Sequence, residues 1–429
     1  MEATNGACAD TDGRPGRPDG VGAPGGTPFS VELERLRVAR GVSWRQLSKL
    51  VGYSPSWLSK VKNGVSPSPS LARRCDEVLG AGGGLLALAD NGPDRLPPAQ
   101  LPAATSGFVG RQAELARMDE VLAGLGVPGT PGVVLVEGPP GVGKTALALR
   151  WSHDVADRFT GGRLHADLRG YADGPAVEPA DVLDDFLVAL GVPAHRIPAE
   201  PDRKATLYRS VVASRGVLIV LDNAARAEQV EPLLPGAAGC AVVITSRNRM
   251  FGLAVRTHAV RISLGALDPA ESAALLRTTV GAAAGSERSI DALARLCANV
   301  PLALRIAAEL VATHAYLSVE EAVALLSEES RRLDMLSQDP SLALRSVLRW
   351  SCRDLGADAT RMLELLARHP EPEVDVATAA TLGHVSAAEA RGLLDGLTGE
   401  NILQRTARDR YAVDDLMRLF ALEHARHRT

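Results

Sequence analysis

The stretch Gly138-Pro-Pro-Gly-Val-Gly-Lys-Thr145 decides how the rest of the sequence is interpreted. It matches the pattern GxxxxGK[ST], and it stands between an apolar run, Val133–Val136, and a helix-forming run, Ala146–Trp151. In such a strand–loop–helix context the glycines let successive backbone N–H groups point at a phosphate, and the following helix adds its positive N-terminal end. A glycine-rich structural turn is the alternative, and the complete motif in its required context disfavours it.

Two side chains of this motif carry the expected chemistry. Lys144 supplies a mobile cation for the β- and γ-phosphate oxygens, and the hydroxyl of Thr145 can ligate Mg²⁺. The motif therefore predicts a site for ADP or ATP together with Mg²⁺. The residues expected to contact the nucleotide are Gly138, Pro140, Gly141, Val142, Gly143, Lys144 and Thr145 of this stretch, and Ala146 directly after it.

Outward from the motif, short β-branched runs alternate with amphipathic helical patterns. The expected strands are Val133–Val136, Arg163–Leu168, Val217–Leu221, Ala241–Thr245 and Ala259–Leu264. Such alternation predicts a parallel sheet covered by helices, because parallel strands need crossover connections.

Two further residues stand at the ends of expected strands, where sheets of this kind bind ligands. Asp222 follows a fully apolar strand and is expected to support Mg²⁺ with Thr145, while Arg247 is expected to sense the γ-phosphate. An ordinary strand-end aspartate and a surface arginine are the respective alternatives. Lys144, Asp222 and Arg247 form the expected catalytic set. Asn223 stands where a carboxylate would orient the attacking water, so hydrolysis is predicted to be slow, below about 1 s⁻¹.

The N-terminal part has the pattern of a helix-turn-helix. Ser43 and Gln46 form a capping box for one helix, Gly52 ends it, and Ser54 with Pro55 begins the next. The second helix can enter the major groove of DNA. The residues expected to face DNA are Arg45, Ser54, Ser56, Trp57, Ser59, Lys60 and Lys62. A small helical domain that binds proteins is the alternative.

This segment resembles the phage-repressor/Cro type of helix-turn-helix over about 60 residues. The resemblance rests on the residues 36–43, Leu47 and Ser54-Pro-Ser-Trp-Leu-Ser-Lys-Val-Lys-Asn-Gly64. It implies contact with double-stranded DNA. Trp44 stands where that family often has a glutamine that binds a DNA phosphate.

Composition agrees with a basic module on an acidic body. The 429-residue chain carries a net charge of −4, yet residues 28–90 hold nine Lys and Arg against five Asp and Glu. A basic segment is suited to a polyanion, although a solvated face is the alternative. Five scattered cysteines form no pair spaced for zinc, and no run is long enough to span a membrane, so a reducing, cytoplasmic location without membrane contact is expected.

From about residue 105 to 425 the sequence resembles the NB-ARC branch of the STAND signalling NTPases. The quoted motif, Asp222 and Arg247 carry the resemblance, together with Gly107-Phe-Val-Gly-Arg111 and Ala298-Asn-Val-Pro-Leu-Ala-Leu304. The resemblance implies that Val109, Arg111 and Pro301 contact the base. It also places Asp414 where the family has a histidine on the β-phosphate of ADP. In the family this histidine helps to hold the ADP-bound resting state. A carboxylate in its place repels the diphosphate and weakens that state unless Mg²⁺ or an arginine intervenes.

The expected fold class is multidomain, with an N-terminal all-α helix-turn-helix, a central α/β P-loop NTPase with a parallel sheet, a helical domain and a C-terminal winged-helix-like domain. The expected boundaries are a disordered tail 1–27, the helix-turn-helix 28–90, a linker 91–106, the NTPase 107–264, the helical domain 265–338 and the winged-helix-like domain 339–429.

The string Leu164-His-Ala-Asp-Leu-Arg-Gly-Tyr171 looks particularly like the regulators of secondary metabolism in this branch. The function expected is therefore a transcriptional regulator switched by ADP and ATP, which binds DNA, hydrolyses ATP slowly or not at all, and self-associates when activated. The alternatives are a STAND-type signalling or defence ATPase whose N-terminal module binds protein partners, and a housekeeping P-loop enzyme such as a metabolic kinase.

Overall fold

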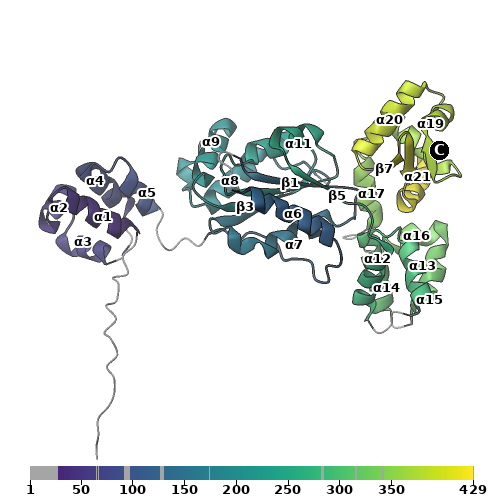
Figure 1. Cartoon of the computed structure of the whole chain (residues 1–429), viewed down its shortest axis with the longest axis horizontal. Helices are drawn as coiled ribbons and strands as arrows, with labels where there is room; N and C mark the ends of the chain where they lie inside the picture. Colours follow the sequence, from purple (N-terminus) through teal and green to yellow (C-terminus); the bar gives the residue numbers. More distant parts are fainter. Residues whose placement is uncertain are drawn as a thin grey trace, which may run out of the picture. The chain divides into compact units, whose positions relative to one another are not determined.

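A computed structural model describes residues 28–63, 65, 67–90, 97–125, 130–172, 174–281, 285–314, 316–339 and 343–428. The chain divides into two compact units, residues 1–96 (unit 1) and 97–429 (unit 2), shown in Figure 1. The tail predicted to be disordered at 1–27 lies outside the described residues, as do Gly64 and residues 91–96 of the predicted linker.

The described part of unit 1 is helical. Its helices are α1 (Pro28–Ala39), α2 (Trp44–Val51), α3 (Pro55–Lys62), α4 (Pro69–Leu79) and α5 (Gly84–Asp90). The caps agree with the sequence pattern: Ser43 and Gln46 form the capping box of α2, Gly52 ends it in the left-handed conformation, and the Ser54 hydroxyl accepts from the backbone of α3. Short turns between capped helices therefore set the helix-turn-helix.

Burial in unit 1 departs from the simple helical pattern at three residues. The apolar side chain of Leu50 on α2 is 55% exposed, and Ala39 at the end of α1 is also exposed. Trp57 was expected to point outward, but it is half-buried and packs against the core beside Leu58. Helices of eight residues present a narrow inward stripe, so residues at its margins are hard to assign from periodicity alone.

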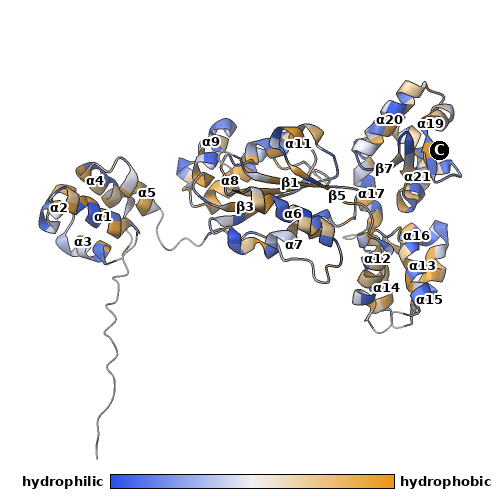
Figure 2. Cartoon of the chain, viewed as in Figure 1, coloured by the Kyte–Doolittle hydropathy of each residue, from blue (hydrophilic) through white to orange (hydrophobic). Residues whose placement is uncertain are grey.

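Unit 2 contains a five-stranded parallel sheet in the order β2-β3-β4-β1-β5. The strands are β1 (Gly132–Glu137), β2 (Gly162–Asp167), β3 (Val217–Ala224), β4 (Ala241–Ser246) and β5 (Val260–Ser263). Each of these five strands overlaps a predicted run, and their ends differ by at most three residues. Both faces are covered by helices, which explains why the central strands have mostly hydrophobic colours in Figure 2.

Helices lie on each face of this sheet (Figure 1). α6 (Gln112–Gly124) and α7 (Lys144–Asp154) cover one face with a core that includes Met118 and Trp151. α8 (Pro179–Ala189), α9 (Pro201–Val212) and α11 (Phe251–Thr257) cover the other face, where Phe186 and Tyr208 are buried. The short helical turns between them are η1 (Ala156–Arg158), η2 (Ala194–Arg196), α10 (Ala227–Val230) and η3 (Glu231–Leu233).

The remainder of unit 2 is mainly helical. Its helices are α12 (Pro269–Val280), α13 (Glu287–Leu296), α14 (Pro301–Thr313), α15 (Val319–Ser327), α16 (Glu329–Met335), α17 (Leu344–Cys352), α18 (Ala357–Arg368), α19 (Val376–Gly383), α20 (Ala387–Gly399) and α21 (Asp415–Arg428). A small antiparallel sheet, β6-β8-β7, is formed by β6 (Glu373–Asp375), β7 (Leu403–Ala407) and β8 (Arg410–Val413). One cluster of buried apolar side chains runs from Leu267 to Ala421.

These elements confirm the multidomain fold class, with an N-terminal helical module, a central parallel α/β sheet and a helical C-terminal region. The predicted boundaries at 264/265 and 338/339 stay predictions, since the cluster from Leu267 to Ala421 crosses the second of them. None of the helices in the described ranges combines the length and the hydropathy needed to cross a bilayer.

Candidate functional site

The predicted phosphate loop, residues 138–145, joins β1 to the start of α7. Three of its glycines have backbone angles in the left-handed region, with φ of +151° at Gly138, +76° at Gly141 and +91° at Gly143. Gly143 is the N-cap of α7 and provides no side-chain cap, so the first N–H groups of α7 stay available to a ligand. A side chain at Gly138 would bring its Cβ to 2.3 Å from the Leu264 carbonyl oxygen.

Lys144 lies inside this loop, and among the residues that the structure describes its ammonium bonds no carboxylate. Its Nζ donates to the backbone carbonyls of Gly138, at 2.8 Å, and Pro139, at 2.7 Å. Burial, reinforced by the nearby cation Arg247 and opposed by Asp222, lowers the pKa of Lys144 to about 7. A buried ammonium facing another cation is a site that an anion would stabilise.

Asp222 and Thr145 meet across the cleft, as the sequence predicts. The Thr145 hydroxyl donates to the Asp222 carboxylate at 2.8 Å, and the Thr245 hydroxyl donates to the same oxygen, Oδ1, at 2.5 Å. Asn223 follows with φ of +59°, and its backbone N–H donates to Thr245 Oγ1 at 2.9 Å. A hydroxyl and a carboxylate are hard oxygen ligands, so the pair fits Mg²⁺.

Arg247 lies in the same cleft but bonds an element about 100 residues away. Its Nη1 donates to the Val347 carbonyl oxygen, at 2.8 Å, and to Ser351 Oγ, at 2.7 Å, both on α17. Its guanidinium also lies over the Tyr171 ring, 4.9 Å from the centroid. Burial lowers the pKa of Arg247 to about 10. Arg247 therefore connects the nucleotide cleft to the C-terminal region.

A cavity of about 670 Å³ joins these groups. It is lined by Thr105, Pro140, Gly141, Gly143, Lys144, Thr145, Ala146, Asp167, Tyr171, Ala172, Asp222, Asn223, Thr245, Ser246, Arg247, Pro301, Leu302, Arg305 and Trp350. α14 closes one side, because the Leu302 backbone N–H donates to the Gly141 carbonyl oxygen at 3.1 Å. The structure thus brings Lys144, Thr145, Asp222 and Arg247 together with Pro301.

The residues expected at the base lie in a second, smaller cavity. It holds about 40 Å³ and is lined by Phe108, Val109, Arg111, Val142, Gly143, Ala146, Leu267, Leu275, Pro301 and Arg305. A water molecule occupies about 30 Å³ in the liquid, so a purine would enter only if these side chains moved apart. Arg111 is 7% exposed, and its guanidinium bonds Glu114 and the Gly265 carbonyl, which fixes its position.

Asp414 does not line either cavity. Its carboxylate accepts from the Met417 backbone N–H at 2.9 Å at the start of α21, and burial raises its pKa. Its predicted contact with a nucleotide stays a prediction.

Sequence reasoning missed several residues that line the larger cavity, above all Asp167 and Tyr171. Asp167 ends β2 in register with Asp222 on β3, and its Oδ1 lies 3.4 Å from the Asn223 side-chain nitrogen. The available signal was an aspartate near the end of each of two consecutive expected strands, Arg163–Leu168 and Val217–Leu221. Tyr171, Arg305 and Trp350 had none, because only the tertiary fold brings them to the cavity.

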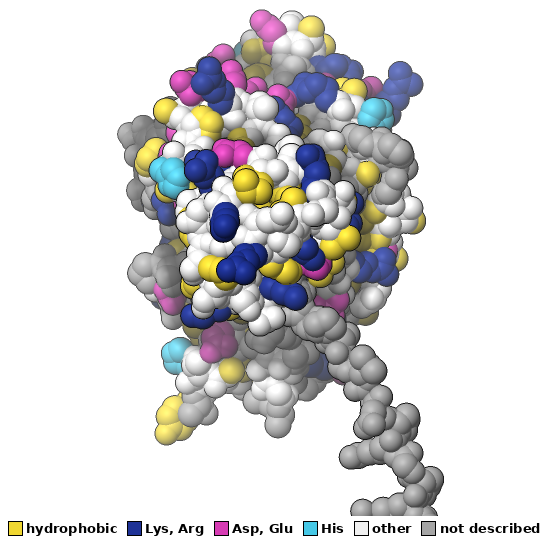
Figure 3. Space-filling view, turned by 90° about the vertical axis from the view of Figure 1, so that its left-hand side faces the viewer, with side chains coloured by type: hydrophobic (Ala, Val, Ile, Leu, Met, Phe, Trp, Pro, Cys, Tyr) yellow, Lys and Arg dark blue, Asp and Glu magenta, His cyan; other side chains and the backbone are white. Residues whose placement is uncertain are grey.

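In unit 1 the predicted DNA-facing residues lie on α2, α3 and the turn between them. Arg45, Ser56, Ser59, Lys60 and Lys62 are exposed. Figure 3 shows Lys and Arg side chains spread over the face of unit 1 on the α2 side.

Other predicted side chains on this face are occupied by contacts within unit 1. The Ser54 hydroxyl caps α3 by accepting from the Trp57 backbone at 3.2 Å. Two cations approach the Trp44 ring: Arg37 Cζ lies 5.0 Å and Lys62 Nζ 5.7 Å from the ring centroid. Trp44 thus orients two basic groups at the position where the resembling family often has a phosphate-binding glutamine.

Known proteins are similar to this chain over unit 1 alone and over most of its length. Residues 28–89 match the family described as helix-turn-helix domain. The chain is 36% identical over 400 residues to the regulatory protein AfsR of Streptomyces coelicolor, and 38% identical over 395 residues to that of Streptomyces griseus. Each alignment covers 90% of this chain and 40% of the relative, so the chain spans well under half the length of these relatives.

A solved structure with similarity is the Aeropyrum pernix ORC2 protein in its ADPNP–ADP complexes. It is 16% identical, with a TM-score of 0.43, covering 79% of this chain and 98% of that chain. At this TM-score the likeness carries no statement about function. The sequence similarities lead to the conclusion that the chain contains a helix-turn-helix domain and is similar to bacterial regulatory proteins.

Proposed function

We propose that the chain is a DNA-binding transcriptional regulator whose unit 2 is a nucleotide switch of the NB-ARC type. The observation that carries this proposal is the position of Arg247 between the phosphate site and α17. It lies in the cleft with Lys144 and Asp222, and it holds α17 through Val347 and Ser351. A group that joins the phosphate site to the C-terminal region is what a nucleotide-controlled rearrangement requires.

The cleft suits a nucleoside di- or triphosphate. Gly141 and Gly143 leave the backbone N–H groups accessible, and the Lys144 ammonium gains the anion it lacks. Thr145 and Asp222 would hold Mg²⁺, which neutralises phosphate charge. Val109 and Pro301 would contact the base after the small cavity widens.

Arg247 would act as the switch because one guanidinium nitrogen, Nη1, makes both bonds to α17. Without a γ-phosphate, Arg247 stays on Ser351 and the Val347 carbonyl. A γ-phosphate beside Lys144 competes for the same guanidinium and releases α17. The shift of the equilibrium equals the difference in affinity of the nucleotide for the two states.

Hydrolysis should be slow. Asn223 carries an amide that cannot take a proton from the attacking water. The neighbouring carboxylate of Asp167 is already engaged by the Arg169 backbone N–H, at 2.9 Å, and by Asn223. Bound ATP would therefore persist long enough to act as a signal rather than as an energy source.

DNA binding by unit 1 is supported by the helix-turn-helix match and by the exposed Lys60 and Lys62 on α3. The relatives named regulatory proteins point the same way. Release of α17 would favour self-association, and several copies of unit 1 on one duplex would multiply weak contacts by avidity.

The test measures binding of the full chain to a labelled DNA duplex by fluorescence anisotropy. The titration is made with Mg²⁺ and either ADP or ATP, between 50 and 200 mM salt. We expect tighter binding with ATP, a steep loss of affinity with salt, and no nucleotide effect in Lys144→Ala. Equal binding with both nucleotides would refute the switch. Salt-independent or absent binding would refute the DNA-binding function and favour a signalling ATPase with a protein-binding module.

A further inference from the structure

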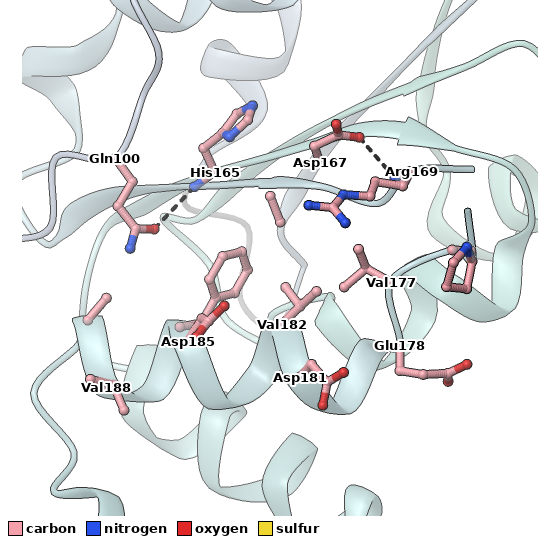
Figure 4. Close-up of a pocket in the computed structure, with 15 residues that line it drawn as sticks. Gln100, His165, Asp167, Arg169, Val177, Glu178, Asp181, Val182, Asp185 and Val188 are labelled. Atoms are coloured by element: carbon pink, nitrogen blue, oxygen red, sulfur yellow. Dashed lines mark hydrogen bonds between the residues drawn. The ribbon is translucent and has the colours of Figure 1, made fainter. Parts of the chain in front are cut away.

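A second large cavity lies outside the nucleotide cleft and is larger than it. It is an open groove of about 1050 Å³ between the edge strand β2 and helix α8 (Figure 4). Asp167 is the one lining residue that it shares with the nucleotide cleft. Nothing in the proposed switch uses this groove.

One wall of the groove is an incompletely paired strand. β2 is the outermost strand of the sheet, and Ala99 forms a parallel bridge with Arg163 at its beginning. The Arg163 N–H donates to the Pro98 carbonyl, and the Gln100 N–H donates to the Arg163 carbonyl at 3.0 Å. The described part of the predicted linker thus pairs with the sheet for three residues.

Beyond Gln100 the edge is open. Because successive residues of a strand point their backbone groups to opposite sides, His165 and Asp167 face outward like Arg163. The Gln100 side-chain oxygen accepts from the His165 N–H at 3.4 Å, as Figure 4 shows. Among the described residues, neither the His165 carbonyl nor the Asp167 N–H has a hydrogen-bond partner. The Gln100 side chain thus makes one hydrogen bond with the open edge of β2, and an added strand could make the next ones.

The other wall is acidic with an apolar floor. Glu178, Asp181 and Asp185 are exposed on and just before α8, while Val182 and Phe186 are buried beneath them. Val188, at the end of the groove, is 53% exposed. Figure 4 shows the Asp185 side chain on the side of α8 nearer to β2, and Asp181 further along the same helix.

The charge balance of the groove is negative. Asp167, Glu178, Asp181 and Asp185 contribute four carboxylates, and Arg169 is the only Lys or Arg among the lining residues. Burial lowers the pKa of His165, which keeps its ring neutral at pH 7. A phosphate-bearing ligand is therefore disfavoured, and a cationic one is favoured.

We propose that this groove binds an extended, basic peptide segment of a partner protein, which adds to β2 as a parallel strand. Its backbone would donate to the His165 carbonyl and accept from the Asp167 N–H. Its apolar side chains would pack on Val177 and Val188, and its Lys or Arg side chains would reach Asp181 and Asp185. Main-chain hydrogen bonds supply affinity in this mode of recognition, and side-chain contacts supply specificity. This site shares only Asp167 with the nucleotide cleft, and binding of the peptide does not require the proposed nucleotide switch.

The test uses the full chain and a fluorescein-labelled peptide, Gly-Lys-Val-Arg-Val-Lys-Val-Arg-Gly, followed by fluorescence anisotropy. Two further peptides carry N-methyl groups on alternate backbone nitrogens, one set on the even and one on the odd positions. We expect binding of the parent peptide, about tenfold weaker binding of one methylated peptide, and little change for the other. Only strand addition distinguishes the two sets, because charge and side chains are the same.

A variant pair tests the acidic wall. Asp181→Asn combined with Asp185→Asn should weaken binding about three- to tenfold. Asp202→Asn, an exposed first-turn aspartate on neighbouring α9, should leave it unchanged. Thermal unfolding of each variant shows that the fold is kept.

Three results would overturn the proposal. The first is no binding of the parent peptide. The second is equal binding of both methylated peptides with displacement by spermine, which would indicate a site for cations only. The third is an equal loss in Asp202→Asn, which would indicate a general effect of surface charge.

Discussion

The unusual ionisation of Lys144 gives a quantitative prediction for nucleotide binding. In the free protein, burial and the neighbouring Arg247 lower its pKa to about 7, from an ordinary value of 10.5. A bound diphosphate adds opposite charge, which returns the pKa toward its ordinary value. Binding at a pH above 7 therefore takes up a proton.

The sign and the size follow from linkage. Below pH 7 Lys144 is charged with or without ligand, so affinity does not depend on its titration. Above pH 7 the free protein loses the proton and the complex keeps it, so affinity falls as pH rises toward 10.5. Between pH 7.5 and 9.5 the charged fraction of free Lys144 falls about 70-fold, so the Kd for ADP should rise by about that factor.

The assay is a titration of the nucleotide-free protein with a fluorescent ADP analogue at half-unit steps of pH. The terminal phosphate does not confound this range, since its second pKa lies near 6. Arg247→Ala provides the matched control: removing the nearby cation should raise the pKa of free Lys144 and move the break to higher pH. Thermal unfolding at each pH establishes that the protein stays folded. A Kd that is constant from pH 7.5 to 9.5 would refute the assignment of Lys144 to the phosphate.

Three further variants test separate parts of the account. Ser351→Ala removes one of the two hydrogen bonds from Arg247 to α17, and such a bond from a charged donor contributes about 1.5–3 kcal/mol. Amide hydrogen exchange in α17 should therefore become tenfold faster or more. Unchanged protection of α17 would contradict the connection between Arg247 and this helix. Lys60→Ala with Lys62→Ala should weaken binding to any duplex and lower the salt slope by about 1.8; an unaltered slope would remove these lysines from the DNA interface. Asp222→Asn should abolish the gain in nucleotide affinity that Mg²⁺ gives the wild type, whereas persistence of that gain would place the metal elsewhere.

Much of the fold could be predicted because the local sequence pattern of each strand and helix agrees with its place in the fold. The run Val217–Leu221 is apolar throughout, as a strand buried on both faces must be, and the structure extends it to Ala224. That extension was not predictable, because Asn223 has a positive φ where the pairing with β4 shifts register. β6 was also missed, since three residues are too few for a period of two to stand out.

The site divides in the same way. The loop around Lys144 was predictable because a phosphate cradle needs glycines at fixed spacing within one short segment. The partners of Arg247 were not, since Val347 and Ser351 lie on a distant helix and no local pattern links them to a strand end. The narrowness of the base cavity, at about 40 Å³, depends on how α12 and α14 pack, which the sequence does not display.

The central claim is that residues 138–145 hold a nucleoside phosphate. The most direct measurement is to denature the purified chain and identify any released nucleotide by chromatography, for the wild type and for Lys144→Ala in parallel. The account predicts a stoichiometric amount of ADP or ATP from the wild type and none from the folded variant. A wild type that takes up and releases no nucleotide, or a variant that retains the same amount, would contradict it.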